Sequence, residues 1–165
     1  MLTRRFARIT MAVTVAALIS AIPLPGRSQT PKNIVDTLND AGNFKTLTRA
    51  LTEAGLVDKL KEPGPFTVFA PTDEAFAKLP AGTLDSWLGN KAALTKILTY
   101  HVVPAKVMVK DLTMYSEAKT VLGEPVRVNT GSTAGVVVET SMVVKADIPA
   151  TNGVIHAIDK VMMPR

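Results

Sequence analysis

The chain has 165 residues, a length that suits a single domain, and it contains no cysteine. The missing thiols exclude a disulfide framework, a thiolate metal site and a lipidated N-terminal cysteine. The formal net charge is +5, but residues 1–28 hold four of the 19 basic residues and none of the 14 acidic ones, which leaves +1 for the remainder. That balance gives no support for nucleic-acid binding.

The first 28 residues have the pattern of an export signal. Arg4, Arg5 and Arg8 precede an apolar stretch from Ile9 to Ile22, and prolines and small residues follow it. The stretch has 14 residues, fewer than the roughly 20 that span a bilayer. We predict a signal peptide at 1–28 and one exported domain at 29–165, with no stable membrane insertion after cleavage. An uncleaved membrane anchor is the alternative.

Helical spacing dominates the first part of the domain. Apolar residues recur every three or four positions between Ile34 and Ala54, and Gly55 is a natural helix stop. The turn "EPGP" at 62–65 leads into "FTVFAP" at 66–71, an apolar run that predicts a strand.

Three short helices are expected next. Thr72 or Asp73 can cap a helix that reaches Leu79, and another short helix closes near Trp87. Asn90 can cap the following helix. The apolar stripe of that helix consists of Leu94, Ile97 and Leu98.

Short β-branched runs separated by glycines and polar turns follow His101. These runs lie at 107–109, 119–122, 126–128, 136–138 and 142–144. A final strand at 154–161 follows an Asn152-Gly153 turn. Because helices come first and strands dominate later without regular alternation, the predicted class is α+β rather than a doubly wound sheet.

Two pairs of residues resemble catalytic or metal sites. Asp73-Glu74 opens a helix, where neighbouring carboxylates diverge by about 100° and cap free N–H groups, so capping is favoured over acid–base catalysis. His156 and Asp159 form an H-x-x-D pattern. On a strand this odd offset sends the two side chains to opposite faces, so we expect a hydrogen-bonded structural histidine and no metal site.

Tyr100-His101 lies inside an otherwise apolar run, "ILTYHVV" at 97–103. If the preceding helix continues, His101 shares a face with the apolar stripe; if a strand has begun, the two side chains face opposite ways. Either geometry turns at least one of them toward apolar neighbours, where a polar group needs a hydrogen-bond partner. A structural role is favoured, and direct contact with a partner is the alternative.

Motifs for nucleophilic catalysis, phosphate binding and dinucleotide binding are absent from the sequence. We therefore expect a protein that is not an enzyme and needs no cofactor. The alternative is an exported hydrolase or small-ligand-binding protein that uses His101, His156 and nearby acids. This alternative requires the two imidazoles to converge in an open pocket.

Three ordered stretches together resemble the fasciclin (FAS1) domain. They are "FTVFAPTDEAFAKLP" at 66–80, "ILTYHVVPAKV" at 97–107 and "DIPATNGVIHAIDKVMMP" at 147–164. The resemblance covers residues 32 to 164, nearly all of the predicted domain. With its short leader and one small domain, the chain is similar to the bacterial secreted members of the family.

The resemblance implies a β-wedge of two small sheets beside a bundle of short helices. It also implies a non-catalytic role in cell adhesion, through contact with a cell-surface or matrix protein or polysaccharide. By the same resemblance the interaction residues are Tyr100, His101, Asp147 and Ile148. Ala105 stands where the family commonly has glycine, and Lys145-Ala146 and Pro149 flank Asp147-Ile148 differently from the animal adhesive versions. We expect a monomer in the periplasm or outside the cell.

Overall fold

The computed structural model describes residues 32–132 and 135–165, so the predicted signal peptide at 1–28 lies outside the described residues. The helices within these ranges are α1 (Ile34–Ala41), α2 (Lys45–Ala54), α3 (Val57–Lys61), α4 (Asp73–Ala77), α5 (Thr83–Gly89), α6 (Lys91–Tyr100) and α7 (Val109–Leu112). The strands are β1 (Phe66–Pro71), β2 (Val102–Val103), β3 (Glu117–Lys119), β4 (Pro125–Ser132), β5 (Gly135–Val138), β6 (Ser141–Ala150) and β7 (Gly153–Ile158).

The helix boundaries follow from capping residues. Asn33 caps α1 by accepting the Asp36 N–H, and Gly42, at φ 74°, ends it in the left-handed conformation that glycine adopts without strain. Gly55 ends α2 in the same way, as predicted. The continuous helical spacing from Ile34 to Ala54 is therefore divided in two at Gly42. The short helix α3 after Gly55 was not predicted.

The predicted caps at Thr72 and Asn90 are confirmed. The Thr72 side chain accepts the Ala75 N–H at the start of α4, and the Asn90 side chain accepts the Ala93 N–H at the start of α6. Helix α6 continues through Tyr100, and His101 is its C-cap with helical backbone angles. Tyr100 and His101 therefore lie at the end of a helix, immediately before β2.

The strands form one seven-stranded sheet in the order β2-β1-β7-β6-β5-β4-β3. The neighbours β1 and β7 are parallel, and the other neighbours are antiparallel. Strand β6 carries two register shifts, between Val143 and Lys145 and between Lys145 and Ile148. The two small sheets that the resemblance implied are thus continuous through β6, and the fold class is α+β, as predicted.

Two of the predicted strands are wrong. The run at 107–109 leads into helix α7, because the Asp111 carboxylate accepts the Met108 N–H and the Asp147 carboxylate accepts the Val109 N–H. The run at 119–122 enters a turn, because both the N–H and the hydroxyl of Thr120 donate to the Glu124 carbonyl. The runs at 126–128, 136–138 and 142–144 lie in β4, β5 and β6. The last strand ends at Ile158 rather than Val161.

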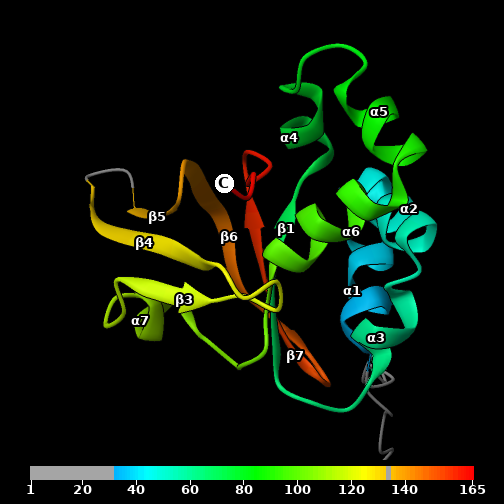
Figure 1. The fold of residues 1–165 in the computed structure, drawn as a ribbon. Coiled ribbons are helices and arrows are strands. Elements are labelled where there is room, and N and C mark those ends of the chain that lie inside the picture. The colour runs from blue at the N-terminus through cyan, green and yellow to red at the C-terminus, as the bar shows by residue number, and fades with distance from the viewer. Residues whose placement is uncertain (1–31, 133–134) are drawn as a thin grey trace, which may run out of the picture.

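Hydrophobic residues form two cores on opposite sides of β1 and β7. Helices α1, α2, α3, α5 and α6 gather on one side of the sheet, whereas β3, β4, β5 and α7 extend to the other (Figure 1). On the helix side, Val68 and Ala70 of β1 pack with Ile155 and Ala157 of β7. On the other side, Phe69 packs with residues from distant segments: Tyr100, Val103, Leu112, Val126, Val128, Val138, Ile158 and Met162.

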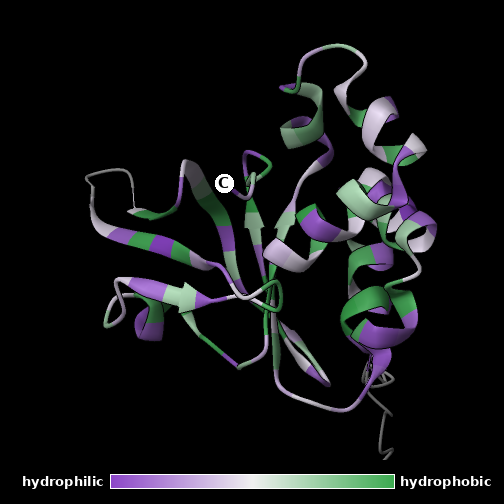
Figure 2. Ribbon diagram, viewed as in Figure 1, coloured by the Kyte–Doolittle hydropathy of each residue, from purple (hydrophilic) through white to green (hydrophobic). Residues whose placement is uncertain are grey.

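The outer strands are amphipathic, unlike β1 and β7. Along β4, hydrophobic and hydrophilic bands alternate (Figure 2), and Val126 and Val128 are buried between exposed neighbours. Strand β7 is buried along its whole length. Of the helices in the described ranges, none combines the length and the apolar composition that crossing a membrane requires.

Candidate functional site

His101 joins the end of α6 to the C-terminal segment. Its side chain is 2 % exposed. Ring atom Nδ1 lies 2.8 Å from the Ile97 carbonyl, and the Met162 N–H donates to Nε2 over 3.0 Å. A main-chain N–H can only donate and a carbonyl can only accept, so the ring is neutral with its proton on Nδ1. Burial lowers the pKa of His101 to about 4, which keeps it neutral near pH 7.

Tyr100 faces the second core, on the opposite side from the apolar stripe of α6. It is 2 % exposed, and its hydroxyl donates to Glu139 Oε1 over 3.3 Å. Burial and the nearby Glu139 carboxylate raise the pKa of Tyr100 to about 12. The same carboxylate oxygen accepts the Arg127 N–H, so Tyr100 is tied to the turn between β5 and β6 and to β4.

His156 fixes a second junction, between β7, β6 and the segment before α7. Its side chain is fully buried and stacks on Phe69 of β1, with ring centroids 5.6 Å apart. Nε2 lies 2.8 Å from the Val107 carbonyl, and the Asp147 N–H donates to Nδ1 over 3.2 Å. The ring is therefore neutral with its proton on Nε2. Burial lowers its pKa, partly offset by the bond to Val107 and the charge of Asp147.

Asp147 is held in an unusual backbone conformation above His156. Its φ is 53°, a left-handed value that few residues other than glycine adopt, although Asp and Asn tolerate it best. Its Oδ1 accepts the Val109 N–H over 2.9 Å, at the first residue of α7. Asp147 is exposed, whereas Ile148 is half-buried against the helix-side core.

The structure places the four predicted interaction residues in different environments. Tyr100 and His101 are buried, with their polar atoms bonded inside the protein. Asp147 lies at the surface, and Ile148 is partly covered. His156 links the two regions, because it binds Asp147 on one side and stacks on Phe69, whose N–H donates to the His101 carbonyl, on the other.

Of the Asp73-Glu74 pair, Asp73 has the predicted capping role, but it caps α2 and not the helix that the pair opens. Thr72 caps α4, while Asp73 Oδ1 accepts the Thr46 N–H over 2.9 Å in the first turn of α2. Asp73 therefore connects two helix starts. It also stabilises the N-terminal dipole of α2 from another segment of the chain.

The H-x-x-D pattern does not form a metal site. Asp159 accepts the Met142 N–H, and its Oδ2 lies 3.5 Å from Lys78 Nζ. Both ring nitrogens of His156 are hydrogen-bonded to main-chain groups. Within the described residues, no three His, Cys, Asp or Glu side chains lie close enough together to hold a metal ion. The prediction that His156 is a hydrogen-bonded structural histidine is confirmed.

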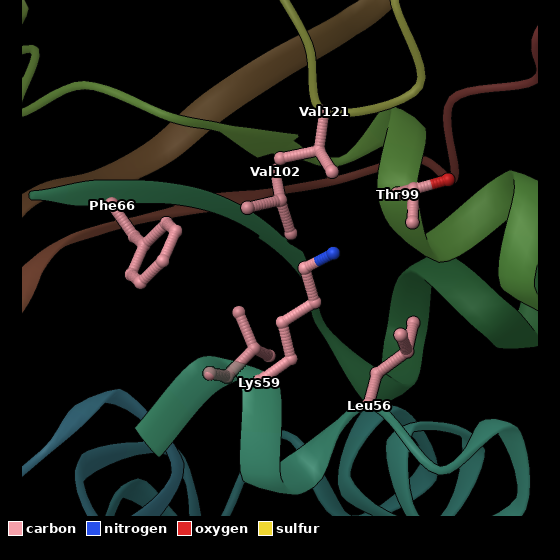
Figure 3. Close-up of a pocket in the computed structure, with 7 residues that line it drawn as sticks. Leu56, Lys59, Phe66, Thr99, Val102 and Val121 are labelled. Carbon is pink, nitrogen blue, oxygen red and sulfur yellow. The ribbon is translucent and has the colours of Figure 1, made fainter. Parts of the chain in front are cut away.

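Three hollows of the described surface are lined by residues other than the two histidines. The first, a cavity of about 20 Å³, is lined by Leu56, Lys59, Leu60, Phe66, Thr99, Val102 and Val121. Figure 3 shows the Lys59 side chain extending between Phe66 and Leu56. The space suits about one water molecule and no larger ligand. The second, a cleft of about 430 Å³, is lined by Asn43, Thr72, Asp73, Glu74, Lys78, Val144 and Asp159.

The third hollow, of about 460 Å³, is termed the edge groove here. It is lined by Val103, Pro104, Ala105, Lys106, Val107, Asp111, Leu112, Tyr115, Glu117, Ala118 and Lys119. Sequence reasoning missed it, because its two walls are separated along the chain by α7 and come together only in the fold. Neither imidazole lines any of these three hollows, so the predicted alternative of converging, accessible histidines has no geometric support.

Comparisons with known proteins agree with this architecture. The chain is 47 % identical over 131 residues to the uncharacterized protein sll1735 of Synechocystis, an alignment covering 79 % of this chain and 97 % of the relative. It is 43 % identical over 149 residues to protein sll1483 of Synechocystis, covering 88 % of this chain and 81 % of that protein.

The fold has also been seen in a solved structure. A FAS1 domain pair from the insect cell adhesion molecule Fasciclin I matches with a TM-score of 0.60 and 18 % identity, over 74 % of this chain and 46 % of that one. The model of the fasciclin domain matches residues 42–164. This chain therefore belongs to the fasciclin (FAS1) domain family and has the FAS1 fold.

Proposed function

We propose that the protein is exported and acts as a non-catalytic, cofactor-free adhesion module. It contacts a cell-surface or matrix component, in the periplasm or outside the cell, and works as a monomer. The leader pattern at 1–28 supports export. Family membership and the FAS1 domains of an insect cell adhesion molecule support the adhesive role.

One observation carries the proposal: both ring nitrogens of each histidine are hydrogen-bonded to main-chain groups. Each ring donates to one main-chain carbonyl and accepts one main-chain N–H, and both side chains are buried. An imidazole without a free nitrogen cannot serve as general base, nucleophile or ligand. The side chains that most resemble catalytic groups thus stabilise a rigid scaffold, and recognition is left to its surface.

Among the four residues first predicted to contact a partner, Asp147 is the one that is exposed. Its conformation is fixed from below by His156 and from the side by Val109. A surface held in this way binds with little rearrangement. Tyr100 and His101 contribute to recognition by positioning this region and the chain that follows them.

A binding assay tests the proposal. The protein purified after expression of the full chain is labelled and added to intact cells, to matrix polysaccharides and to peptidoglycan, with heat-denatured protein as the control. We expect saturable binding to at least one of these surfaces. The absence of saturable binding to all three would contradict the adhesive role.

Cell fractionation tests export separately. The protein should appear in the periplasm or the medium, with an N-terminus near residue 29. Recovery of an intact chain from the cytoplasm would contradict the predicted signal. Sedimentation equilibrium should give the mass of one chain.

A further inference from the structure

The edge groove lies where the two ends of the sheet approach each other. Strands β2 and β3 are the outermost strands of the seven. The Val121 N–H donates to the Val102 carbonyl over 2.8 Å and joins the two ends at one point. Beyond that point, the lining residues come from the connection between β2 and α7 on one side and from β3 on the other. Figure 1 shows β3 and α7 at the far side of the sheet from the other helices. The sheet is therefore nearly closed, with a gap between β3 and the connection that follows β2.

Strand β3 presents unused main-chain groups to this gap. Ser116 accepts the Val128 N–H, and the Thr120 N–H donates to the Glu124 carbonyl, so residues 116, 118 and 120 are those that face β4. The alternation of an antiparallel ladder then turns the N–H and C=O of Glu117 and Lys119 away from β4. Consistently, Lys119 is opposite Pro125, which has no N–H to offer.

The opposite wall is held rigid by a buried hydroxyl. Thr67 Oγ1 donates to the Ala105 carbonyl over 2.5 Å and accepts the Val107 N–H over 2.8 Å. His156 binds the Val107 carbonyl. Between these anchored residues, the N–H and C=O of Lys106 have no hydrogen-bond partner in the described part of the chain. Both walls thus offer main-chain donors and acceptors from backbone that other hydrogen bonds hold in place.

The lining of the groove combines an apolar floor with rims that carry two lysines and two carboxylates. Val103 and Leu112 are buried beneath it, and Tyr115, at 60 % exposure, stands at one end. Both lining carboxylates are already engaged: Asp111 accepts the Met108 N–H, and Glu117 Oε1 lies 3.9 Å from Arg127 Nε.

The lysines of the groove are free, in contrast to its carboxylates. Lys106 on one wall and Lys119 on the other form no ion pair with a described carboxylate. The lining is formally neutral as a whole, and its two charged side chains without a described partner, one on each wall, are both cationic. An occupant that carries negative charge complements them.

We propose that the edge groove binds an extended, acidic segment of a partner protein, which adds to β3 as a further strand. This inference rests on the proposed binding role and names the surface and the partner class. The open main-chain groups of β3 and Lys106 select an extended polypeptide, as in other cases of strand addition. The two lysines select acidic side chains, and the exposed ring of Tyr115 supplies an aromatic anchor.

Selection from a phage-displayed library of random linear heptapeptides tests the inference, with the purified protein as bait. Selected peptides should alternate β-branched or aromatic residues with Asp or Glu. Labelled synthetic copies should bind with affinity that falls as salt concentration rises. Failure to enrich any peptide, or enrichment of basic peptides, would contradict the proposal.

Charge variants locate the binding surface. The double variant Lys106→Glu with Lys119→Glu should weaken peptide binding at least tenfold, because both rims then repel the peptide. A matched double reversal, Lys45→Glu with Lys96→Glu, changes two exposed helix lysines outside the groove and should leave the affinity within twofold. Equal affinity of all three proteins would place the peptide elsewhere.

Proline at the edge separates strand addition from simple charge attraction. Lys119→Pro removes the N–H that faces the groove and should abolish binding, whereas Lys119→Gln removes the charge alone and should weaken it only a few-fold. A melting curve checks that Lys119→Pro folds. Peptides N-methylated at alternate residues give the same test on unmodified protein: one of the two registers should lose binding and the other keep it. Equal binding of both registers would overturn strand addition.

An anionic polysaccharide is the competing occupant, and alginate serves as its probe. If alginate binds the protein, displaces the selected peptide and is itself released by the Lys106→Glu and Lys119→Glu double variant, the groove is a polysaccharide site and the proposal is wrong. The intact-cell assay separates this inference from the proposed function. If the groove variants still bind cells, the adhesive role is retained, but the edge groove is not the surface that performs it.

Discussion

Neutral, buried imidazoles make the stability of this fold sensitive to acid. His101 and His156 each accept a main-chain N–H through an unprotonated ring nitrogen. Protonation of that nitrogen abolishes the acceptor and places a charge in an apolar core. The pKa of His101 is lowered from 6.5 to about 4, and that of His156 is lowered in the same direction.

The sign of the pH dependence follows from these shifts. As pH falls below about 6.5, the unfolded state takes up the protons first, so the free energy of unfolding decreases until His101 itself titrates near pH 4. The loss attributable to His101 is about 3 kcal/mol over this window. Urea unfolding between pH 7.5 and 4 measures it. His101→Gln, which cannot titrate, should show a shallower slope; an unchanged slope would contradict the assignment.

Asp147 illustrates how one residue type can serve two local needs. Its left-handed backbone favours Asp, Asn or Gly, and its carboxylate, which projects from β6, caps α7. Asp147→Asn retains both properties and should change the free energy of unfolding by less than about 0.5 kcal/mol. Asp147→Ala loses the cap and strains the backbone, at a cost of about 2 kcal/mol. Equal stability of the two variants in urea would show that neither feature matters.

At the level of elements, Thr67 anchors the wall of the edge groove to β1. Thr67→Val keeps the shape of the side chain but leaves the Val107 N–H without its acceptor, which should cost about 2 kcal/mol. Hydrogen exchange at the Val107 amide should accelerate more than at the core of β1. Thr67→Ser keeps the hydroxyl and should preserve the protection of Val107. Unchanged exchange in Thr67→Val would disprove the anchor.

The parallel pairing of β1 and β7 depends on the absence of a side chain at Gly153. A Cβ built at this position would lie 1.9 Å from the Phe66 carbonyl oxygen, far inside contact distance. Gly153→Ala should therefore destabilise the protein by at least about 4 kcal/mol. The matched control is Gly89→Ala at the end of α5, where an added Cβ meets nothing within 4 Å. Thermal unfolding compares the two, and a similarly mild effect at both sites would contradict the close approach.

The sequence predicts those elements whose signals are local. Gly55, Thr72 and Asn90 mark helix boundaries by their own backbone or side-chain chemistry, and all three predictions are confirmed. His156 lies in β7, as the strand prediction required, whereas Asp159 lies just beyond the end of β7 and accepts the Met142 N–H.

What the sequence missed depends on contacts between distant residues. The β-branched run at 107–109 enters α7 because Asp147, 38 residues away, caps it. Nothing in the pattern around Tyr100-His101 reveals that His101 binds Met162, 61 residues on, or that Tyr100 reaches Glu139. The edge groove escapes prediction for the same reason, since its walls meet only when the sheet curves toward closure.

At the scale of the whole molecule, β1 and β7 separate two hydrophobic cores and contribute side chains to both. One face of β1 and β7 packs on the helices, and the other packs on Tyr100, Leu112 and the outer strands. The two histidines tie these halves together: His101 links α6 to the C-terminal segment, and His156 links β7 to the region before α7. Both surface features discussed above, Asp147 and the edge groove, lie along that second junction.

The central claim is that His101 supports the scaffold and that the surface performs recognition. Binding of the His101→Gln and His101→Ala variants to intact cells tests it, at a temperature where melting curves show each protein folded. Loss of the imidazole leaves the Met162 N–H without its acceptor, so His101→Ala should lower stability by about 3 kcal/mol and lower the Tm, while the folded fraction keeps wild-type affinity. Unchanged Tm together with lost cell binding would make His101 a contact residue and contradict the account.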